Sequence, residues 1–302
     1  MLWLIGKFSA NLWGIVFMTL SAAVMTGMAV VVRHLAEGLH PFQIAFFRNL
    51  FGVIILMPLL WRNGLAMLRT DDMGLMAARG IFNATAMLSF FVALTMLPLA
   101  EISALMFTVP LFVALMVAVF LKERLGPHRV VSLFIGFSGA LVILRPGIEI
   151  AQVGALYVLF SAITWGSAVV LIKRLSRTNS SVTITFYGLS FLTLFTFVPA
   201  LFVWEWPGME QYGWLIVIAA GGTVGQLMFT QSLKMADATL VMPFDFTKLI
   251  WAAVFGFLIF SEIPTVWTLG GGAIIFASST YITYREGRRK LTASSPAPAE
   301  VV

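Results

Sequence analysis

Apolar residues fall in ten long blocks along the chain, separated by short polar or charged segments. A helix needs about 20 mainly apolar residues to cross the hydrocarbon core of a bilayer. In lipid the backbone must satisfy its own hydrogen bonds, so spanning segments are helices or the strands of closed barrels. The blocks lack the alternation of a membrane barrel, and we therefore expect helices. The predicted spans are residues 11–32, 42–61, 73–96, 100–121, 129–145, 152–172, 182–203, 212–231, 238–260 and 265–284.

The composition also indicates an all-α membrane protein. Hydrophobic residues make up 60% of the chain and charged residues 11%, whereas a soluble domain carries about 25% charged residues. The first apolar block is longer than the apolar region of a signal peptide, so we expect it to be a retained span. The chain contains no cysteine, which excludes a disulfide framework and cysteine-based metal or redox sites.

The basic residues predict how the spans are oriented. Of the nineteen Lys and Arg residues, Arg48, Arg79 and Lys248 lie inside predicted spans. With the N-terminus in the cytoplasm, fourteen of the others lie in cytoplasmic segments, and the outer loops hold only Arg33 and Arg145. Because short cytoplasmic loops are enriched in Lys and Arg, we predict a multi-pass inner-membrane protein with both termini in the cytoplasm. The net charge of +6 is then a topology signal that requires no nucleic-acid partner.

The two halves of the chain resemble each other. Residues in the first half recur in the second at offsets of about 136 to 140 positions. The matching pairs are SAAVMTGMAVVVRHL (21–35) with SAITWGSAVVLIKRL (161–175), LPLAEISAL (97–105) with LKMADATLV (233–241), and FLKE (120–123) with IFSE (259–262).

This repeat predicts two units of five spans each, residues 11–146 and 150–286, followed by a disordered cytoplasmic tail, residues 287–302. Because five is odd, the second unit enters the membrane in the opposite orientation. Inverted repeats are typical of secondary transporters, in which the substrate binds near the midplane between the repeats. A membrane enzyme has no comparable need for inverted symmetry.

Several motifs resemble the drug/metabolite transporter superfamily, in its ten-span form with two EamA-type repeats. They are PFQIAFFRNLFG (41–52), ARGIFNATAM (78–87), LPLAEISALMFTVPLFVALMVAVFLKERL (97–125), GFSGALVILRPG (136–147) and MPFDFTKLIWAAVFGFLIFSEIP (242–264). The pattern is most similar to the subgroup of S-adenosylmethionine uptake carriers. Riboflavin carriers and exporters of amino acids, metallophores or drugs are more distant comparisons.

The resemblance implies a central cavity lined mainly by spans 1, 3, 4, 6, 8 and 9, with spans 5 and 10 to the side as scaffold or dimer contacts. The run of small residues at 270–273 permits close helix approach and allows for a homodimer. The first repeat has Met25 and Thr26 where the second has Trp165 and Gly166. The family often carries the Trp-Gly dipeptide in both repeats, so this chain departs from a symmetric gate at span 1.

Charged residues inside spans are candidates for a substrate site, because they usually face a cavity or a partner. Arg79 and Asn83 share a face of span 3 and match the family motif, so a substrate carboxylate or phosphate is one ligand for this guanidinium. Alternatively, Arg79 reaches the cytoplasmic headgroups or pairs with Asp72. Arg48 lies in span 2, which is peripheral in this family, and is interpreted as structural.

Asp245 and Lys248 lie three residues apart in span 9, where they share a face and can neutralise each other. Pro243 loosens the helix beside them. The pair either binds charged groups of a substrate, with Asp245 as a proton-coupling carboxylate, or is a self-satisfied structural pair. Trp165 and Gln226 are candidates for stacking on and hydrogen bonding to a ring-bearing substrate.

These features predict a secondary transporter of small organic metabolites, amino-acid-derived or similar to S-adenosylmethionine, working by alternating access. No phosphate-binding loop of the P-loop type is present in the sequence, so we expect no ATP hydrolysis. We also expect no catalytic residues, cofactor or metal; His34, Glu37 and His40 share one loop but lack a fourth ligand. The alternative of another class is an integral-membrane lipid-modifying enzyme.

Overall fold

The described part of the chain is built from helices. The computed structural model describes residues 2–63, 68–120, 127–144, 149–236 and 238–293. These residues form twelve helices and no strand. The helices are α1 (Leu2–Leu35), α2 (Pro41–Asn63), α3 (Met73–Leu94), α4 (Leu99–Met106), α5 (Val109–Phe120), α6 (Pro127–Leu144), α7 (Glu149–Leu175), α8 (Ser181–Leu201), α9 (Met209–Met235), α10 (Ala238–Asp245), α11 (Thr247–Phe260) and α12 (Val266–Ala293).

The twelve helices correspond to the ten predicted spans, because two spans are each broken into two helices. α4 and α5 share the predicted span 100–121, and α10 and α11 share the span 238–260. Within the described residues, seven segments are long and apolar enough to cross a membrane, and two apolar helices are shorter. α12 continues to Ala293, so residues 287–293 of the predicted tail are helical, whereas 294–302 lie outside the described residues.

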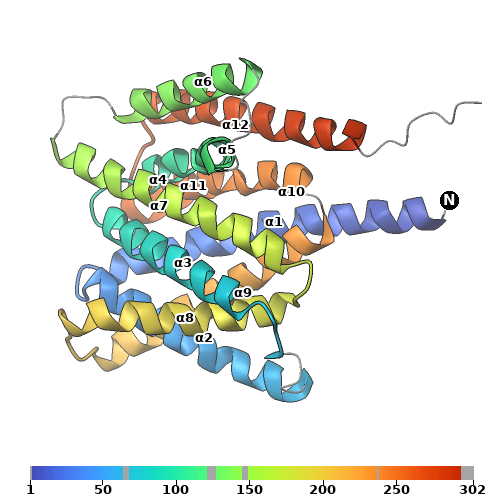
Figure 1. Cartoon of the computed structure of the whole chain (residues 1–302). Helices are drawn as coiled ribbons and strands as arrows, with labels where there is room; N and C mark the ends of the chain where they lie inside the picture. The colour runs from blue at the N-terminus through green and yellow to red at the C-terminus, as the bar shows by residue number, and fades with distance from the viewer. Residues whose placement is uncertain (1, 64–67, 121–126, 145–148, 237, 294–302) are drawn as a thin grey trace, which may run out of the picture.

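Matching turns show the internal repeat in the structure. In the turn between α1 and α2, Ala36 N–H donates to the Val32 carbonyl at 3.0 Å, and Leu39 N–H donates to the Leu35 carbonyl at 2.9 Å. The turn between α7 and α8 repeats these bonds 140 positions later, from Ser176 to Ile172 at 2.9 Å and from Asn179 to Leu175 at 2.9 Å. The turns join helices that run in opposite directions, since α1 and α7 are antiparallel (Figure 1). The two halves therefore form an inverted repeat.

Two serine hydroxyls repeat the same symmetry between helices. Ser21 of α1 donates to the Gly225 carbonyl of α9 at 2.8 Å, and Ser161 of α7 donates to the Ala86 carbonyl of α3 at 2.9 Å. Each serine belongs to one repeat and each carbonyl to the other. Hydrogen bonds between helices hold their backbones together inside a bilayer. These two contacts between the halves are thus related to each other by the repeat.

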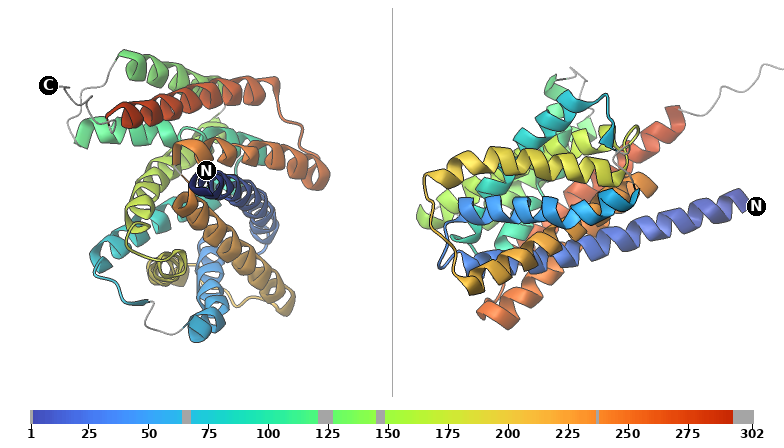
Figure 2. Two further views of the ribbon diagram at one scale, coloured as in Figure 1. Left: turned by 90° about the vertical axis from the view of Figure 1, so that its right-hand side faces the viewer. Right: turned by 90° about the horizontal axis from the view of Figure 1, so that it is seen from below.

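The helices form a bundle in which each repeat packs against the other. α1 packs along α9, α7 along α3, and α2 along α8, as Figures 1 and 2 show. α6 and α12 lie side by side at one edge of the bundle (Figure 1). This arrangement leaves the centre to be enclosed by α1, α3, α4, α7, α9 and the broken helix α10–α11.

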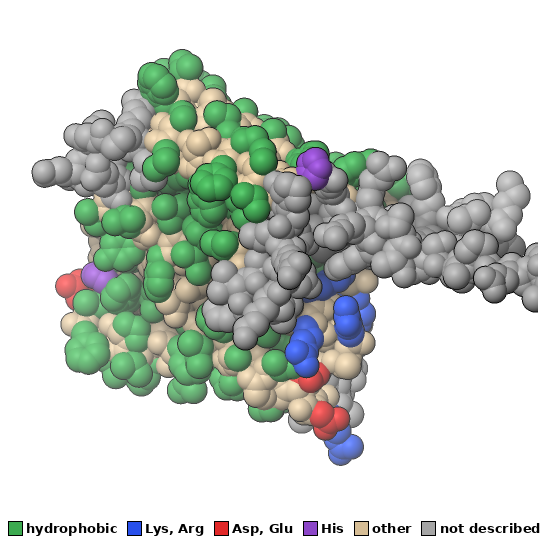
Figure 3. Space-filling model, turned by 45° about the horizontal axis from the view of Figure 1, so that its top comes forward, with side chains coloured by type: hydrophobic (Ala, Val, Ile, Leu, Met, Phe, Trp, Pro, Cys, Tyr) green, Lys and Arg blue, Asp and Glu red, His purple; other side chains and the backbone are tan. Residues whose placement is uncertain are grey.

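The outer surface is largely apolar. Large hydrophobic side chains such as Phe134, Leu156 and Leu258 are exposed. On the face in Figure 3, hydrophobic side chains cover the middle, and Lys and Arg side chains gather at the end where α1 begins. Apolar exposure on this scale is typical of a surface that faces lipid. The chain is a multi-pass membrane protein.

Candidate functional site

A cavity of about 170 Å³ lies between the two repeats. One water needs roughly 10–15 Å³ by a comparable measure, so the cavity has room for a small organic molecule. Its lining comes from spans 1, 3, 4, 6, 8 and 9, as the family resemblance implies, together with Arg48 of α2. The wall is mostly apolar and rich in methionine, with Met25, Met28, Met87, Met106 and Met242 all lining it.

Two helix breaks form part of the cavity wall. α4 ends at Met106 and α5 begins at Val109, just before Pro110, whose ring would clash with the Met106 carbonyl in a continuous helix. The Thr108 hydroxyl donates to the Leu105 carbonyl at 2.7 Å. A proline inside a helix commonly causes a bend, and here the helix is interrupted completely beside Pro110.

The second break repeats this geometry 139 positions later. α10 ends at Asp245, α11 begins at Thr247, and the Thr247 hydroxyl donates to the Phe244 carbonyl at 2.8 Å. Phe107 and Phe246 occupy equivalent places at the two breaks, and their ring centroids lie 4.4 Å apart with an interplanar angle of 86°. Edge-to-face contact of this kind is favourable for aromatic rings. The two repeats therefore meet at their interrupted helices, beside the cavity.

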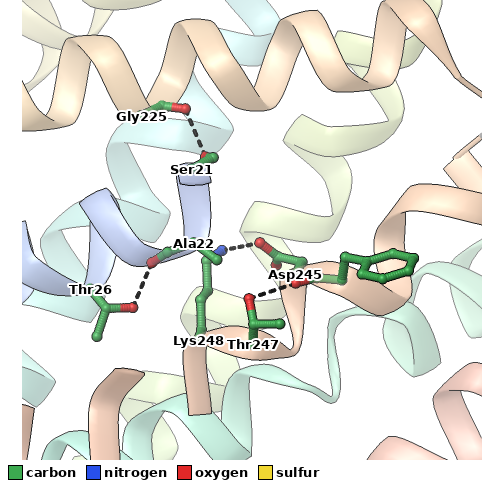
Figure 4. Close-up of polar contacts among 8 residues, drawn as sticks. Ser21, Ala22, Thr26, Gly225, Asp245, Thr247 and Lys248 are labelled. Carbon is green, nitrogen blue, oxygen red and sulfur yellow. Dashed lines mark hydrogen bonds and ion pairs between the residues drawn. The ribbon is translucent and has the colours of Figure 1, made fainter. Parts of the chain in front are cut away.

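Asp245 and Lys248 lie at the second break and line the cavity. Their Oδ1 and Nζ atoms are 2.6 Å apart, and both side chains are largely buried. Lys248 Nζ also lies 6.0 Å from the centre of the Phe229 ring. Figure 4 shows the pair beside the stretch of α1 that carries Ser21 and Ala22. The pair is thus self-neutralised and still accessible from the cavity.

Three other predicted site residues share this cavity. Asn83, Trp165 and Gln226 all line it. Gln226 is buried, and its amide donates to the Thr230 hydroxyl at 3.3 Å. The Trp165 ring lies 5.7 Å from that of Phe229. The structure therefore brings together residues from α3, α7, α9 and the α10–α11 break, which are far apart in the sequence.

Arg79 lies elsewhere. The residue is 1% exposed, and its guanidinium packs between α3 and α8, where Nη1 donates to the Ile184 carbonyl at 2.7 Å. Gly188 makes room for it, because a methyl group there would lie 1.9 Å from Nη1. Asp72, the alternative partner, instead accepts hydrogen bonds from Thr178 at 2.7 Å and Asn179 at 2.9 Å. Arg79 is not among the residues that line the cavity.

Arg48 lines the cavity in place of Arg79. It is 4% exposed, and its Nη1 donates to the Asn49 side-chain oxygen at 2.7 Å. A methyl group on Gly222 of α9 would lie 2.5 Å from its Nε, so the guanidinium lies directly over this glycine. The interpretation of Arg48 as a peripheral structural residue missed this position. A charge inside a span was the signal that could have found it.

Similarity to known proteins indicates the function of this cavity. The profile of the EamA-like transporter family matches residues 12–145 and again residues 152–284. The chain belongs to the EamA-like transporter family. The two matches cover nearly all of the predicted spans, so family membership applies to the whole membrane part.

Several characterised transporters are similar to this EamA-like transporter. The S-adenosylmethionine uptake transporter of Rickettsia felis is 28% identical over 91% of this chain and 94% of its own. The riboflavin transporter of Brucella anthropi is 31% identical, over 83% of this chain and 90% of its own. The pseudopaline exporter of Pseudomonas aeruginosa is 29% identical, over 87% and 93%. These relatives carry small molecules, and this chain is accordingly a transporter of small metabolites.

A crystal structure shares the fold of this EamA-like transporter. It superposes with a TM-score of 0.60 at 20% sequence identity, and the match covers 93% of this chain and 99% of the other. At that identity the likeness concerns the fold alone.

Proposed function

We propose that the protein is a secondary carrier that moves an amino-acid-derived metabolite, similar to S-adenosylmethionine, by alternating access to the cavity between its repeats. The observation that carries this proposal is the cavity itself, which lies where two broken helices of opposite orientation meet. Broken helices at the interface of inverted repeats are a common way to build a midplane binding site in transporters. The S-adenosylmethionine uptake transporter among the relatives supports the choice of substrate class.

In this proposal the substrate contacts Asn83, Trp165, Gln226, Asp245 and Lys248, which line one cavity. Trp165 supplies a ring face for stacking, and the two amides supply hydrogen bonds. Asp245 and Lys248 exchange their mutual contact for contacts to the substrate. Asp245 is also the carboxylate best placed to couple transport to protons.

The protein lies in the inner membrane with both termini in the cytoplasm, in agreement with the distribution of Lys and Arg along the chain. The protein acts with a small-molecule substrate in a lipid bilayer and without a cofactor. A homodimer would use the edge formed by α6 and α12. Export and riboflavin transport are the alternatives, because a pseudopaline exporter and a riboflavin transporter are similarly close relatives.

Counterflow in proteoliposomes tests the proposal. Liposomes with purified protein are loaded with unlabelled S-adenosylmethionine and placed in trace radiolabelled S-adenosylmethionine, with riboflavin loading as a parallel arm. We expect transient accumulation of the label above equilibrium with the wild type, and not with Lys248→Met or with protein-free liposomes. Gly270→Ala is a matched control, since a methyl group there meets nothing within 4 Å.

The chemical form of the recovered label separates a carrier from an enzyme. A carrier returns unchanged S-adenosylmethionine, whereas a membrane enzyme returns a product or labelled lipid. Counterflow with riboflavin alone would replace the proposed substrate class and retain the carrier mechanism. Absence of counterflow with every loaded compound would contradict the proposal.

A further inference from the structure

Arg48 is a buried cation in the cavity wall, and no carboxylate in the described part of the chain forms an ion pair with it. Its Nη1 donates to Asn49 at 2.7 Å and lies 4.0 Å from the Met87 sulfur, and its Nε has no hydrogen-bond partner among the residues that the structure describes. The carboxylate that lines the cavity, Asp245, is bound to Lys248. A buried charge is costly unless it is paired and hydrogen-bonded, so this guanidinium is poised to accept an anion.

Arg79 is a second buried arginine, in a different environment. Both arginines are almost fully buried, and each lies over a glycine of the opposite repeat, Gly222 for Arg48 and Gly188 for Arg79. Arg79 donates to a backbone carbonyl between two helices and does not line the cavity. Its environment is that of a packing residue. The Nε atoms of both arginines lack a hydrogen-bond partner among the described residues, but only Arg48 lines the cavity, where a ligand can reach it.

The charges that line the cavity indicate which anion fits. Lys248 and Asp245 cancel, so Arg48 leaves the described lining with one net positive charge. A carboxylate carries one negative charge and matches the planar fork of a guanidinium through two parallel hydrogen bonds. A phosphate monoester carries nearly two charges at neutral pH, which exceeds the single positive charge of Arg48.

We infer that Arg48 binds the carboxylate of the transported metabolite and makes the cavity selective for substrates that carry one. This inference rests on the proposed carrier function. Gly222 leaves room for the guanidinium at the cavity wall, because a side chain on α9 at this position would clash with Arg48. Asn49 orients it through the bond to Nη1.

The test compares ligands that differ only in the carboxylate. Thermal-shift titrations of the purified protein use S-adenosylmethionine against decarboxylated S-adenosylmethionine, and methionine against methioninamide, with riboflavin as a ligand that lacks a carboxylate. We expect the carboxylate member to bind at least about tenfold more tightly, the range for hydrogen bonds to charged groups. In Arg48→Met this preference disappears, and Arg48→Lys restores part of it.

Melting without ligand separates a binding role from a structural one. Removing a poised, unneutralised charge should leave Arg48→Met as stable as the wild type or more stable, because binding sites are often optimised at the expense of stability. Arg79→Met is the matched control and should melt lower, since Arg79 is enclosed between α3 and α8 and bonded to Ile184, whereas Arg48 borders an open cavity. If Arg48→Met melts as low as Arg79→Met, the inference is wrong.

Two further outcomes would overturn the inference without touching the carrier function. One is equal binding of both members of each pair by the wild type. The other is an Arg48→Met variant that keeps the carboxylate preference. Failure of the carrier function would show instead as absent counterflow with every compound, and the melting comparison would still decide the role of Arg48.

Discussion

The Arg33 guanidinium lies 2.5 Å from the Glu262 carboxylate and 4.5 Å from the centre of the Phe260 ring. The other Glu262 oxygen accepts the Leu99 N–H at 3.1 Å. One carboxylate thus ties the end of α1 to the turn before α12 and to the start of α4. These three elements come together at the end of the bundle that the basic residues predict to be outside.

We expect Glu262→Gln to loosen this end of the bundle. An ion pair of this kind contributes on the order of 1 kcal/mol, which is about a fivefold change in a conformational equilibrium. Because the chain has no cysteine, Ser103→Cys in the cavity wall gives a single labelling site. A membrane-impermeant thiol reagent added outside should label Ser103→Cys several-fold faster when Glu262→Gln is also present.

Glu37→Gln is the control for that experiment, because Glu37 is an exposed acid in a turn at the same end. It should leave the labelling rate unchanged. Equal rates with and without Glu262→Gln would show that this contact does not restrict access to the cavity.

Gly271→Ala should destabilise the protein, whereas Gly270→Ala should not. A methyl group on Gly271 would lie 2.6 Å from the Gly139 carbonyl oxygen and 2.5 Å from Ile143 Cγ1, but one on Gly270 meets nothing within 4 Å. Overpacking of this kind costs about 1–3 kcal/mol. Thermal melting in detergent measures the difference, and similar melting temperatures would mean that α6 and α12 adjust without penalty.

The Asp245–Lys248 pair should behave as a coupled unit. Asp245→Asn or Lys248→Met alone leaves one unneutralised charge at the cavity wall, which we expect to cost on the order of 2 kcal/mol. The double variant should melt closer to the wild type than either single variant and still fail in counterflow. Additive losses in a double-mutant cycle would show that the 2.6 Å contact contributes little to stability.

Phe107 and Phe246 should be coupled in both stability and transport. Their edge-to-face contact is worth about 0.5–1.5 kcal/mol beyond burial, and both rings line the cavity. We expect Phe107→Ala and Phe246→Ala to lower the melting temperature and to slow counterflow. Phe112→Ala removes the similar contact between Phe112 and Phe137, whose ring centroids are 5.2 Å apart, and should lower stability with little effect on counterflow.

Much of the fold could be predicted from the sequence, because lipid as a solvent limits the choices. The apolar segments are long enough to span a bilayer, and their backbone groups must form hydrogen bonds within the protein, so helices are the expected structure. The matches between residues 21–35 and 161–175 indicate the repeat. The breaks at Phe107 and Phe246 were only partly predictable. Pro110 marks the first break, but Pro243 lies three residues before the second. At the second break the Thr247 hydroxyl donates a hydrogen bond to the Phe244 carbonyl.

The candidate site could be predicted where two opposite charges lie close enough in one span to neutralise each other. Asp245 and Lys248 stand three apart, a spacing at which helix geometry predicts contact, and they are in contact across the break at Phe246. The two arginines could not be told apart on this basis. Each is a single charge in an apolar span, and helix periodicity does not say which neighbouring helix will present a glycine or a cavity.

The sequence alone determined the membrane environment, the helical class and the inverted repeat, because all three depend on local composition and on similarity between segments. Only the tertiary structure decided that Arg48 lines the cavity while Arg79 packs against Ile184 and Gly188. The physical reason is that the surroundings of a buried charge are set by helices distant in the sequence, whose packing fixes where space and hydrogen-bond acceptors remain.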